Sequence, residues 1–335
     1  MIFGLPAATC PNKSSNTKYM KKNITEQYRD NQERIKEDIE EIKGIESIRP
    51  LRLEVDFDGE GPLGSYEVLD VFPNGKEQDI PAVFFAGFAN QASDYLTALK
   101  TTALEGKRRA IAWEDRKGLD IGPVRYDHEA HVPRTQLSKV LGVIESLEYL
   151  GADRVDAIAH SEGAIHAIVA ASLYPEKFRS ITLVNPAGIV GNQGFTSLMK
   201  GVLREAFDRI RNWGKADRSI GGTKKVMNAQ YAKHLLESMF NISKSQLHGM
   251  LEELRKNDEV KVAIVHTRDD RLFDFSEMEK VLKSGKSGSV EDYVDRMHVV
   301  DQGGHSNLLA SVESVKKHVL GPLADLNANR QEITE

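Results

Sequence analysis

A chain of 335 residues, 40% hydrophobic and 28% charged, has the composition of a globular protein and enough material for a sizeable core. Its net charge of −5 provides no basic field, and no apolar run approaches the ~18 residues that span a bilayer, so we expect neither a nucleic-acid partner nor a membrane span. The single cysteine, Cys10, excludes disulfides within the chain and favours a cytoplasmic location.

Residues 1–44 are predicted to form an N-terminal extension that ends in a surface helix. Between residues 23 and 43 the chain is highly charged, and its few apolar side chains recur at helical spacing. Such a thin apolar stripe is typical of a solvated helix that rests on a larger domain.

Two strands follow this extension. Residues 50–58 alternate apolar and polar side chains, which is the period of a half-exposed strand, and residues 65–72 form a second strand after a turn. Two adjacent early strands of this kind predict an antiparallel hairpin at the edge of a sheet.

Beyond the hairpin, short apolar strands alternate with helical patterns. Residues 80–85 are almost continuously apolar, as expected of a strand that is buried on both faces. This rhythm indicates strand–helix–strand crossovers and a parallel sheet covered by helices on both faces. The later strands are predicted at residues 108–113, 155–160, 181–184, 260–265 and 297–300.

The rhythm is interrupted over residues 189–258, where apolar side chains recur at helical spacing without a convincing strand. We therefore predict a helical insertion there, between two parts of one α/β core at residues 45–188 and 259–322. Residues 323–335 are polar and are predicted to be a C-terminal tail.

The functional prediction depends on residues 155–165. An apolar strand turns abruptly at Ser161 and continues as an apolar helix, with the small residues Ala159 and Gly163 two positions to either side. Small neighbours are needed at such a corner because the turn crowds their Cβ positions, while the serine side chain stands clear of the sheet. This is the geometry of an exposed nucleophile.

Taken together, the parts resemble the α/β-hydrolase fold over roughly residues 51–320. In that family the nucleophile usually lies in a Gly-x-Ser-x-Gly turn after the fifth strand. Here the turn reads Ala159-His160-Ser161-Glu162-Gly163, with alanine in place of the first glycine. The resemblance implies a mostly parallel eight-stranded sheet with helices on both faces and a helical lid at residues 189–258.

The resemblance also implies partners for Ser161. The family's acid lies on the loop after the strand that follows the lid, often three residues beyond a glycine. Counting from Thr267, which occupies the glycine position, gives Asp270, with Asp269 as the alternative. The family's histidine follows the last strand and corresponds to His305. The chain order serine, acid, histidine is the one that this fold uses.

The oxyanion hole is implied in the same way. The turn Ala86-Gly87-Phe88 is similar to the family's His-Gly-x turn after its third strand, and carrying the family's donors over gives the backbone N–H groups of Phe88 and Glu162. We expect the Glu162 carboxylate to point away toward the lid or a basic group, with an effect on substrate charge preference as the alternative.

These residues imply a serine hydrolase that acts on a small-molecule acyl substrate through an acyl-enzyme and needs no metal or organic cofactor. Within the insertion, Phe195, Met199 and Trp213 are expected to contact the substrate, because ligand sites are mainly apolar. Carboxylic esters and lactones are the default substrates, while amides and carbon–carbon bonds beside a ketone stay open. The same triad serves acyltransferases, and the fold also hosts ligand receptors with slow or no turnover.

A metal site was considered at Asp127, His128 and His131. No third ligand cluster accompanies them, and their loop position suits the rim of a pocket, so we expect no metal. The sequence predicts nothing about the oligomeric state.

Overall fold

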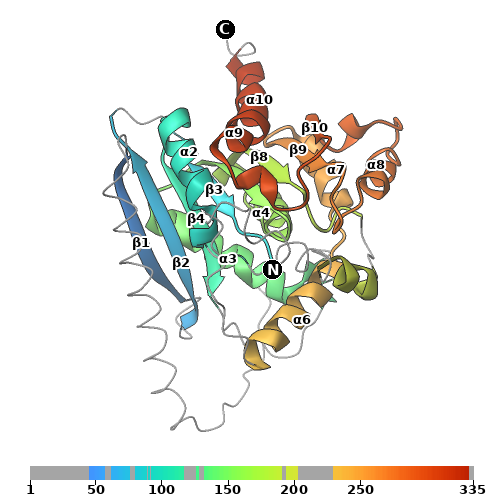
Figure 1. Ribbon diagram of the computed structural model, residues 1–335, viewed down its shortest axis with the longest axis horizontal. Coiled ribbons are helices and arrows are strands. Elements are labelled where there is room, and N and C mark those ends of the chain that lie inside the picture. The colour runs from blue at the N-terminus through green and yellow to red at the C-terminus, as the bar shows by residue number, and fades with distance from the viewer. Residues whose placement is uncertain are drawn as a thin grey trace. The chain divides into compact units, whose positions relative to one another are not determined.

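An eight-stranded sheet in the order β1-β2-β4-β3-β7-β8-β9-β10 organises the described part of the chain (Figure 1). The predicted N-terminal extension and surface helix at residues 1–44, and the predicted substrate contact Trp213, lie outside the residues that the structure describes. The computed structural model describes residues 45–56, 62–75, 80–88, 90, 92–116, 126–127, 132–190, 194–202 and 229–331.

One side of the sheet is antiparallel. β2 (Pro62–Pro73) pairs antiparallel both with β1 (Ile45–Asp56), which lies at the edge, and with β4 (Ala110–Arg116). The antiparallel hairpin predicted at the sheet edge is therefore confirmed.

The rest of the sheet is parallel, which confirms the predicted fold class. The central strands are apolar and buried on both faces, because helices cover the sheet on either side. The parallel strands are β3 (Ala82–Phe85), β7 (Val155–His160), β8 (Phe178–Val184), β9 (Lys261–Thr267) and β10 (Arg296–Val300). A separate two-stranded ribbon joins β5 (Tyr126–Asp127) to β6 (Val132–Pro133).

Two groups of helices cover the sheet. α3 (Arg134–Tyr149), α4 (Gly163–Leu173) and α7 (His248–Asn257) contact one another in series. α2 (Leu96–Gly106) and α10 (Gly321–Gln331) both contact residues 315–320, the helical segment that immediately precedes α10. The other helical segments are η1 (Ala92–Tyr95), η2 (Pro175–Lys177), residues 195–202, α6 (Ala229–Lys244), α8 (Phe275–Leu282), η3 (Val290–Asp292), η4 (Asn307–Leu309), α9 (Val312–Ser314) and the π-helical η5 (Val315–Leu320).

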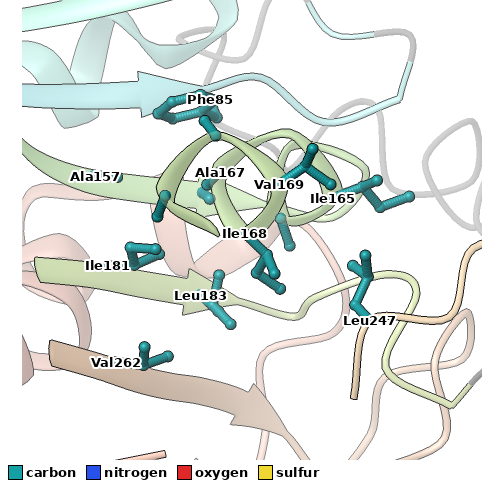
Figure 2. Close-up of a cluster of buried hydrophobic side chains, with 14 of the residues drawn as sticks. Phe85, Ala157, Ile165, Ala167, Ile168, Val169, Ile181, Leu183, Leu247 and Val262 are labelled. Carbon is teal, nitrogen blue, oxygen red and sulfur yellow. The ribbon is translucent and has the colours of Figure 1, made fainter. Parts of the chain in front are cut away.

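The hydrophobic core is centred on α4 (Figure 2). Nearly every α4 side chain is buried, which is expected of a helix that is apolar on all sides and lies between the sheet and its neighbouring helices. The labelled core side chains are Ile165, Ala167, Ile168 and Val169 of α4 itself and, around this helix, Phe85, Ala157, Ile181, Leu183, Leu247 and Val262. This packing fixes the end of α4 that follows Ser161.

α7 falls at the end of the predicted insertion and packs against the core. α7 lies within the predicted range of residues 189–258, yet Leu251 is buried in the main core and α7 contacts both α4 and β9. α7 thus packs against the α/β core although it falls within the predicted insertion, because helical spacing alone does not reveal which surface a helix covers.

Residues 323–331, which fall within the predicted C-terminal tail, belong to α10. Leu323 and Leu326 lie three positions apart on one helix face and are buried, and α10 contacts β8 and β9. Two apolar residues in a polar stretch are too few to predict this docking. Among the described helices, none has the length and apolar character that crossing a membrane requires.

Candidate active site

Ser161 lies at a sharp corner between β7 and α4. Its φ of 55° is left-handed, a conformation that costs a residue with a Cβ roughly 1–2 kcal/mol. Backbone hydrogen bonds hold it there: the Ser161 N–H donates to the Val184 carbonyl at 3.1 Å, and the Ser161 carbonyl accepts from Ala187 N–H at 3.0 Å. Such strain persists only where the surroundings over-determine it, and it occurs often at functional sites.

The small residues around the corner are required by close packing. A Cβ on Gly163 would lie 2.3 Å from the Phe85 carbonyl oxygen, and a Cβ on Gly87 would lie 3.0 Å from the Ser161 Cβ. Ala159 is fully buried between the paired residues Phe85 and Leu183. Alanine therefore fits the position of the first glycine, whereas Gly163 has no room for a side chain.

Asp270 and His305 are in contact at the carboxyl ends of the neighbouring strands. The His305 Nδ1 lies 2.8 Å from Asp270 Oδ2, and both side chains are buried. An ionised carboxylate only accepts hydrogen bonds, so Nδ1 carries a proton, and in the neutral ring Nε2 then keeps a lone pair. Nε2 is buried and makes no hydrogen bond with any residue of the described chain.

The other carboxylate oxygen of Asp270 fixes the acid loop. Oδ1 accepts from the backbone N–H of Leu272 at 2.8 Å and of Phe273 at 3.1 Å. Burial would raise the pKa of Asp270, but the attraction of His305 and the hydrogen bonds hold this pKa below its usual value. Asp270 is therefore an anion at neutral pH.

Asp269, the alternative acid, has a different set of contacts. Its carboxylate accepts from the backbone N–H groups of Gly303 at 3.3 Å and Gly304 at 2.8 Å. It therefore supports the glycine turn in front of His305, while the imidazole itself is bound by Asp270.

Of the two residues carried over as oxyanion donors, one lies in the turn after β3 and the other directly follows Ser161. Phe88 follows Gly87 in the turn after β3, and Glu162 immediately precedes α4, where the first backbone N–H groups have no intrahelical partner. The Glu162 carboxylate is buried and lies 3.4 Å from Lys139 Nζ on α3. The expected contact of Glu162 with a basic group is thus observed.

His166 lies one helical turn further along α4 and is fully buried. Burial, followed by repulsion from Lys139, lowers the pKa of His166 to about 3 against the opposing attraction of Glu162. His166 is therefore neutral at neutral pH. The edge of its ring contacts Trp113, with ring centroids 6.1 Å apart.

Three further polar residues surround the corner. His160 hydrogen-bonds through one ring nitrogen to the Tyr95 hydroxyl and through the other to the His305 carbonyl. Asn185 also donates to the His305 carbonyl, at 2.8 Å. The sequence did not predict the roles of Tyr95 and Asn185, because their partners His160 and His305 lie 65 and 120 residues away along the chain.

Of the predicted substrate contacts, Phe195 and Met199 lie in helical residues 195–202. Both are half-buried and pack against the hydrophobic core, as does Phe88. Their contact with a substrate stays a prediction. Of the residues considered for a metal, Asp127 lies in β5, and His128 and His131 lie outside the described residues.

No protein-family model matches the sequence, and no curated protein matches it. Solved structures match its fold. An esterase from Thermogutta terrifontis has a TM-score of 0.57 and 11% identity over 83% of this chain and 99% of its own. An α/β-hydrolase fold protein from Chitinophaga pinensis has a TM-score of 0.55 and 15% identity over 80% and 95% of the two chains. A bromoperoxidase from Bacillus anthracis has a TM-score of 0.53 and 14% identity over 84% and 100%.

These similarities, together with the strand order, show that the chain has the α/β-hydrolase fold. The different activities in the names of the similar proteins illustrate that this fold does not specify one reaction. The reaction has to be argued from the side chains at the corner.

Proposed function

Because the chain has the α/β-hydrolase fold, we propose that it is a serine hydrolase that cleaves a small carboxylic ester or a related acyl substrate. The observation that supports this most is the buried Asp270–His305 pair on the same sheet edge as the strained Ser161. β7, β9 and β10 run parallel, so their carboxyl ends, where these three residues follow, lie along one edge.

In the proposed reaction, Ser161 Oγ attacks the acyl carbon while His305 Nε2 takes the hydroxyl proton. Asp270 holds the Nδ1–H tautomer and stabilises the imidazolium that forms. His305 then returns the proton to the leaving alcohol as the carbon–oxygen bond breaks, which leaves an acyl group on Ser161. Water, deprotonated by His305, attacks this ester, and His305 then returns the proton to Ser161 Oγ as the bond between Oγ and the acyl carbon breaks and the acid is released.

The backbone N–H groups of Phe88 and Glu162 are proposed to bind the oxyanion of each tetrahedral intermediate. Loss of one such donor typically slows a reaction by about 10²–10³. Both groups belong to the backbone, so the substitution of histidine by Ala86 in the turn does not remove a donor. No step of this reaction requires a metal or an organic cofactor.

We propose that the insertion beginning at residue 189 covers this site as a lid, with Phe195, Met199 and Trp213 in contact with the acyl group. The half-buried state of Phe195 and Met199 is compatible with a mainly apolar ligand site. Because α7 packs in the core, we place the lid before this helix. The remaining proposed parts are an extension at residues 1–44 and an α/β core that comprises residues 45–188 and the chain from α7 to α10.

A fluorophosphonate probe and a series of p-nitrophenyl esters test the proposal. We expect the probe to label Ser161, the esters to be hydrolysed, and Ser161→Ala to lose both activities while keeping its circular dichroism spectrum and melting temperature. Ser180→Ala, at a buried serine of the neighbouring strand, is the matched control and should still be labelled. Near-normal hydrolysis by Ser161→Ala would exclude the proposed nucleophile.

The same experiment separates the alternatives. Labelling of Ser161 combined with transfer of the acyl group to an added alcohol in preference to water would indicate an acyltransferase. A folded wild-type protein that the probe does not label would indicate a ligand-binding protein without turnover. Chain-length preference among the esters would report on the proposed apolar contacts.

A further inference from the structure

We propose that His160, Tyr95 and Asn185 are positioning residues that fix the peptide of His305 and the turn at Gly87 relative to Ser161. This inference rests on the proposed function, because it concerns the alignment of the proposed base and oxyanion turn with the proposed nucleophile. It is carried by a continuous chain of buried hydrogen bonds that runs from the end of β3 to the end of β9.

His160 occupies the centre of this chain. It is the last residue of β7, immediately before Ser161, and its side chain is buried. Its Nε2 lies 3.0 Å from the His305 carbonyl oxygen. A carbonyl only accepts, so Nε2 must carry a proton and donate it. In the neutral ring, Nδ1 is then left as an acceptor.

The Tyr95 hydroxyl satisfies that acceptor. It lies 3.0 Å from His160 Nδ1, and it accepts from the Gly87 N–H at 2.7 Å and from Asn90 Nδ2 at 2.9 Å. A hydroxyl has one proton and two lone pairs, so with both lone pairs engaged its proton is directed to His160. These hydrogen bonds therefore specify one tautomer of His160, and they link its ring through Tyr95 to Gly87, the residue before Phe88.

Asn185 supplies the second donor to the same carbonyl. It follows β8 with a left-handed φ of 44° and is completely buried. Its Nδ2 lies 2.8 Å from the His305 oxygen and 3.2 Å from the Gly304 oxygen, and its Oδ1 accepts from the Thr267 N–H at 2.9 Å. Asparagine suits this position because its amide both donates and accepts, and because it tolerates the left-handed region.

Two donors from different strands thus converge on the His305 carbonyl. The peptide plane is fixed by His160 and Asn185, while the imidazole is fixed by Asp270. Because both the peptide and the imidazole of His305 are held, the remaining ring nitrogen, Nε2, can point in only one direction. A displacement of about 1 Å in such a constellation can slow a reaction by about 10².

The test compares variants at single residues, each of which removes one or more hydrogen bonds of this network. Tyr95→Phe deletes one oxygen, His160→Phe removes both ring nitrogens, and Asn185→Asp keeps the shape but replaces the donor to the His305 carbonyl by an acceptor. His160→Gln is the conservative variant, because its amide can still donate from the position of Nε2. Ser180→Ala is the matched control: it removes a buried hydrogen bond that Ser180 donates to the Asp156 carboxylate at the opposite ends of β7 and β8.

The rate constant and the amplitude of fluorophosphonate labelling are measured separately. We expect Tyr95→Phe, His160→Phe and Asn185→Asp to label about 10–10² times more slowly at full amplitude, with a near-normal KM for a short ester. His160→Gln should recover much of the rate, and Ser180→Ala should label at the wild-type rate. Wild-type rate constants in all three variants, or losses in amplitude alone, would overturn the positioning role.

A spectroscopic readout keeps this inference separate from the proposed function. The downfield proton resonance of the His305–Asp270 hydrogen bond is expected in the wild type and in Ser180→Ala, and it should be lost or broadened in His160→Phe and Asn185→Asp. If the wild type is not labelled, the proposed function fails, and this resonance still decides whether the chain holds His305. An unchanged resonance in both variants would contradict the inference. If His160→Phe does not fold, Tyr95→Phe and Asn185→Asp provide the decision.

Discussion

A buried carboxylate beside an oxyanion site opposes the negative charge that develops there, so the contact between Glu162 and Lys139 bears on the proposed reaction. Lys139→Met removes the ammonium group that lies 3.4 Å from Glu162 Oε1, so the lysine no longer offsets the carboxylate charge. We expect kcat/KM for a p-nitrophenyl ester to fall at least about tenfold, or ~1.4 kcal/mol. The double variant Lys139→Met, Glu162→Gln should recover most of this loss. A double variant as slow as Lys139→Met would show that the lysine acts by packing.

The lowered pKa of His166 in the folded protein predicts that the stability depends on pH. The unfolded chain binds a proton at this residue below its usual pKa of 6.5, whereas the folded protein excludes it until about pH 3. Stability is therefore lost as the pH falls through this window. Between pH 7 and pH 5 the free energy of unfolding of the wild type should fall by about 2 kcal/mol more than that of His166→Gln. Urea unfolding at both pH values measures this, and equal losses in the two proteins would contradict it.

At the residue scale, the sequence predicted those site residues that follow strands in a fixed order. Asp270 and His305 were assigned because the family resemblance implies an acid and a histidine after successive strands, and the structure brings these two side chains into contact. Tyr95 and Asn185 could not be assigned in this way. Their partners are backbone groups and side chains on other loops, and no local spacing encodes such contacts.

The junction of β7 and α4 shows how an element constrains one residue. A Cβ on Gly163 would lie 2.3 Å from a backbone oxygen of Phe85, so Gly163→Ala must push β3 and α4 apart. We expect a loss of about 1–3 kcal/mol in stability and slower labelling of Ser161. Gly249→Ala in α7 is the control, since nothing lies within 4 Å of its Cβ, and it should be neutral or slightly stabilising. Equal stability of the two variants would refute the packing argument.

Elements were predicted well where their apolar pattern was dense. The core strands and α4 have continuous apolar sequences because both faces are buried. α10 was missed beyond residue 320, since its burial depends on Leu323 and Leu326 in an otherwise polar stretch. The packing of α7 on the core could not be predicted either, because helical spacing does not reveal which surface a helix packs against.

Over the whole molecule, a second buried polar network lies far from the candidate site. Asp156, near the start of β7, accepts hydrogen bonds from Arg108 at 2.5 Å, from Arg179, and from Ser180 at 2.6 Å. Asn327 of α10 also lies 3.4 Å from this carboxylate. Because the strands are parallel, this network lies at their amino ends and Ser161 lies at their carboxyl ends. The amino ends of β7 and β8 therefore fasten α10 to the sheet, while the carboxyl ends carry the proposed chemistry.

Asp156→Asn tests this division. It leaves Arg108 buried without its carboxylate, and breaking a buried ion pair typically costs about 3–5 kcal/mol. We expect a loss of this size in urea unfolding, with an unchanged rate constant for labelling of Ser161 in the fraction that is folded. Asp258→Asn, which removes exposed ion pairs at a left-handed position that asparagine tolerates, should cost less than about 1 kcal/mol. A labelling rate that falls together with stability in Asp156→Asn would mean that the two edges are mechanically coupled through β7 and β8.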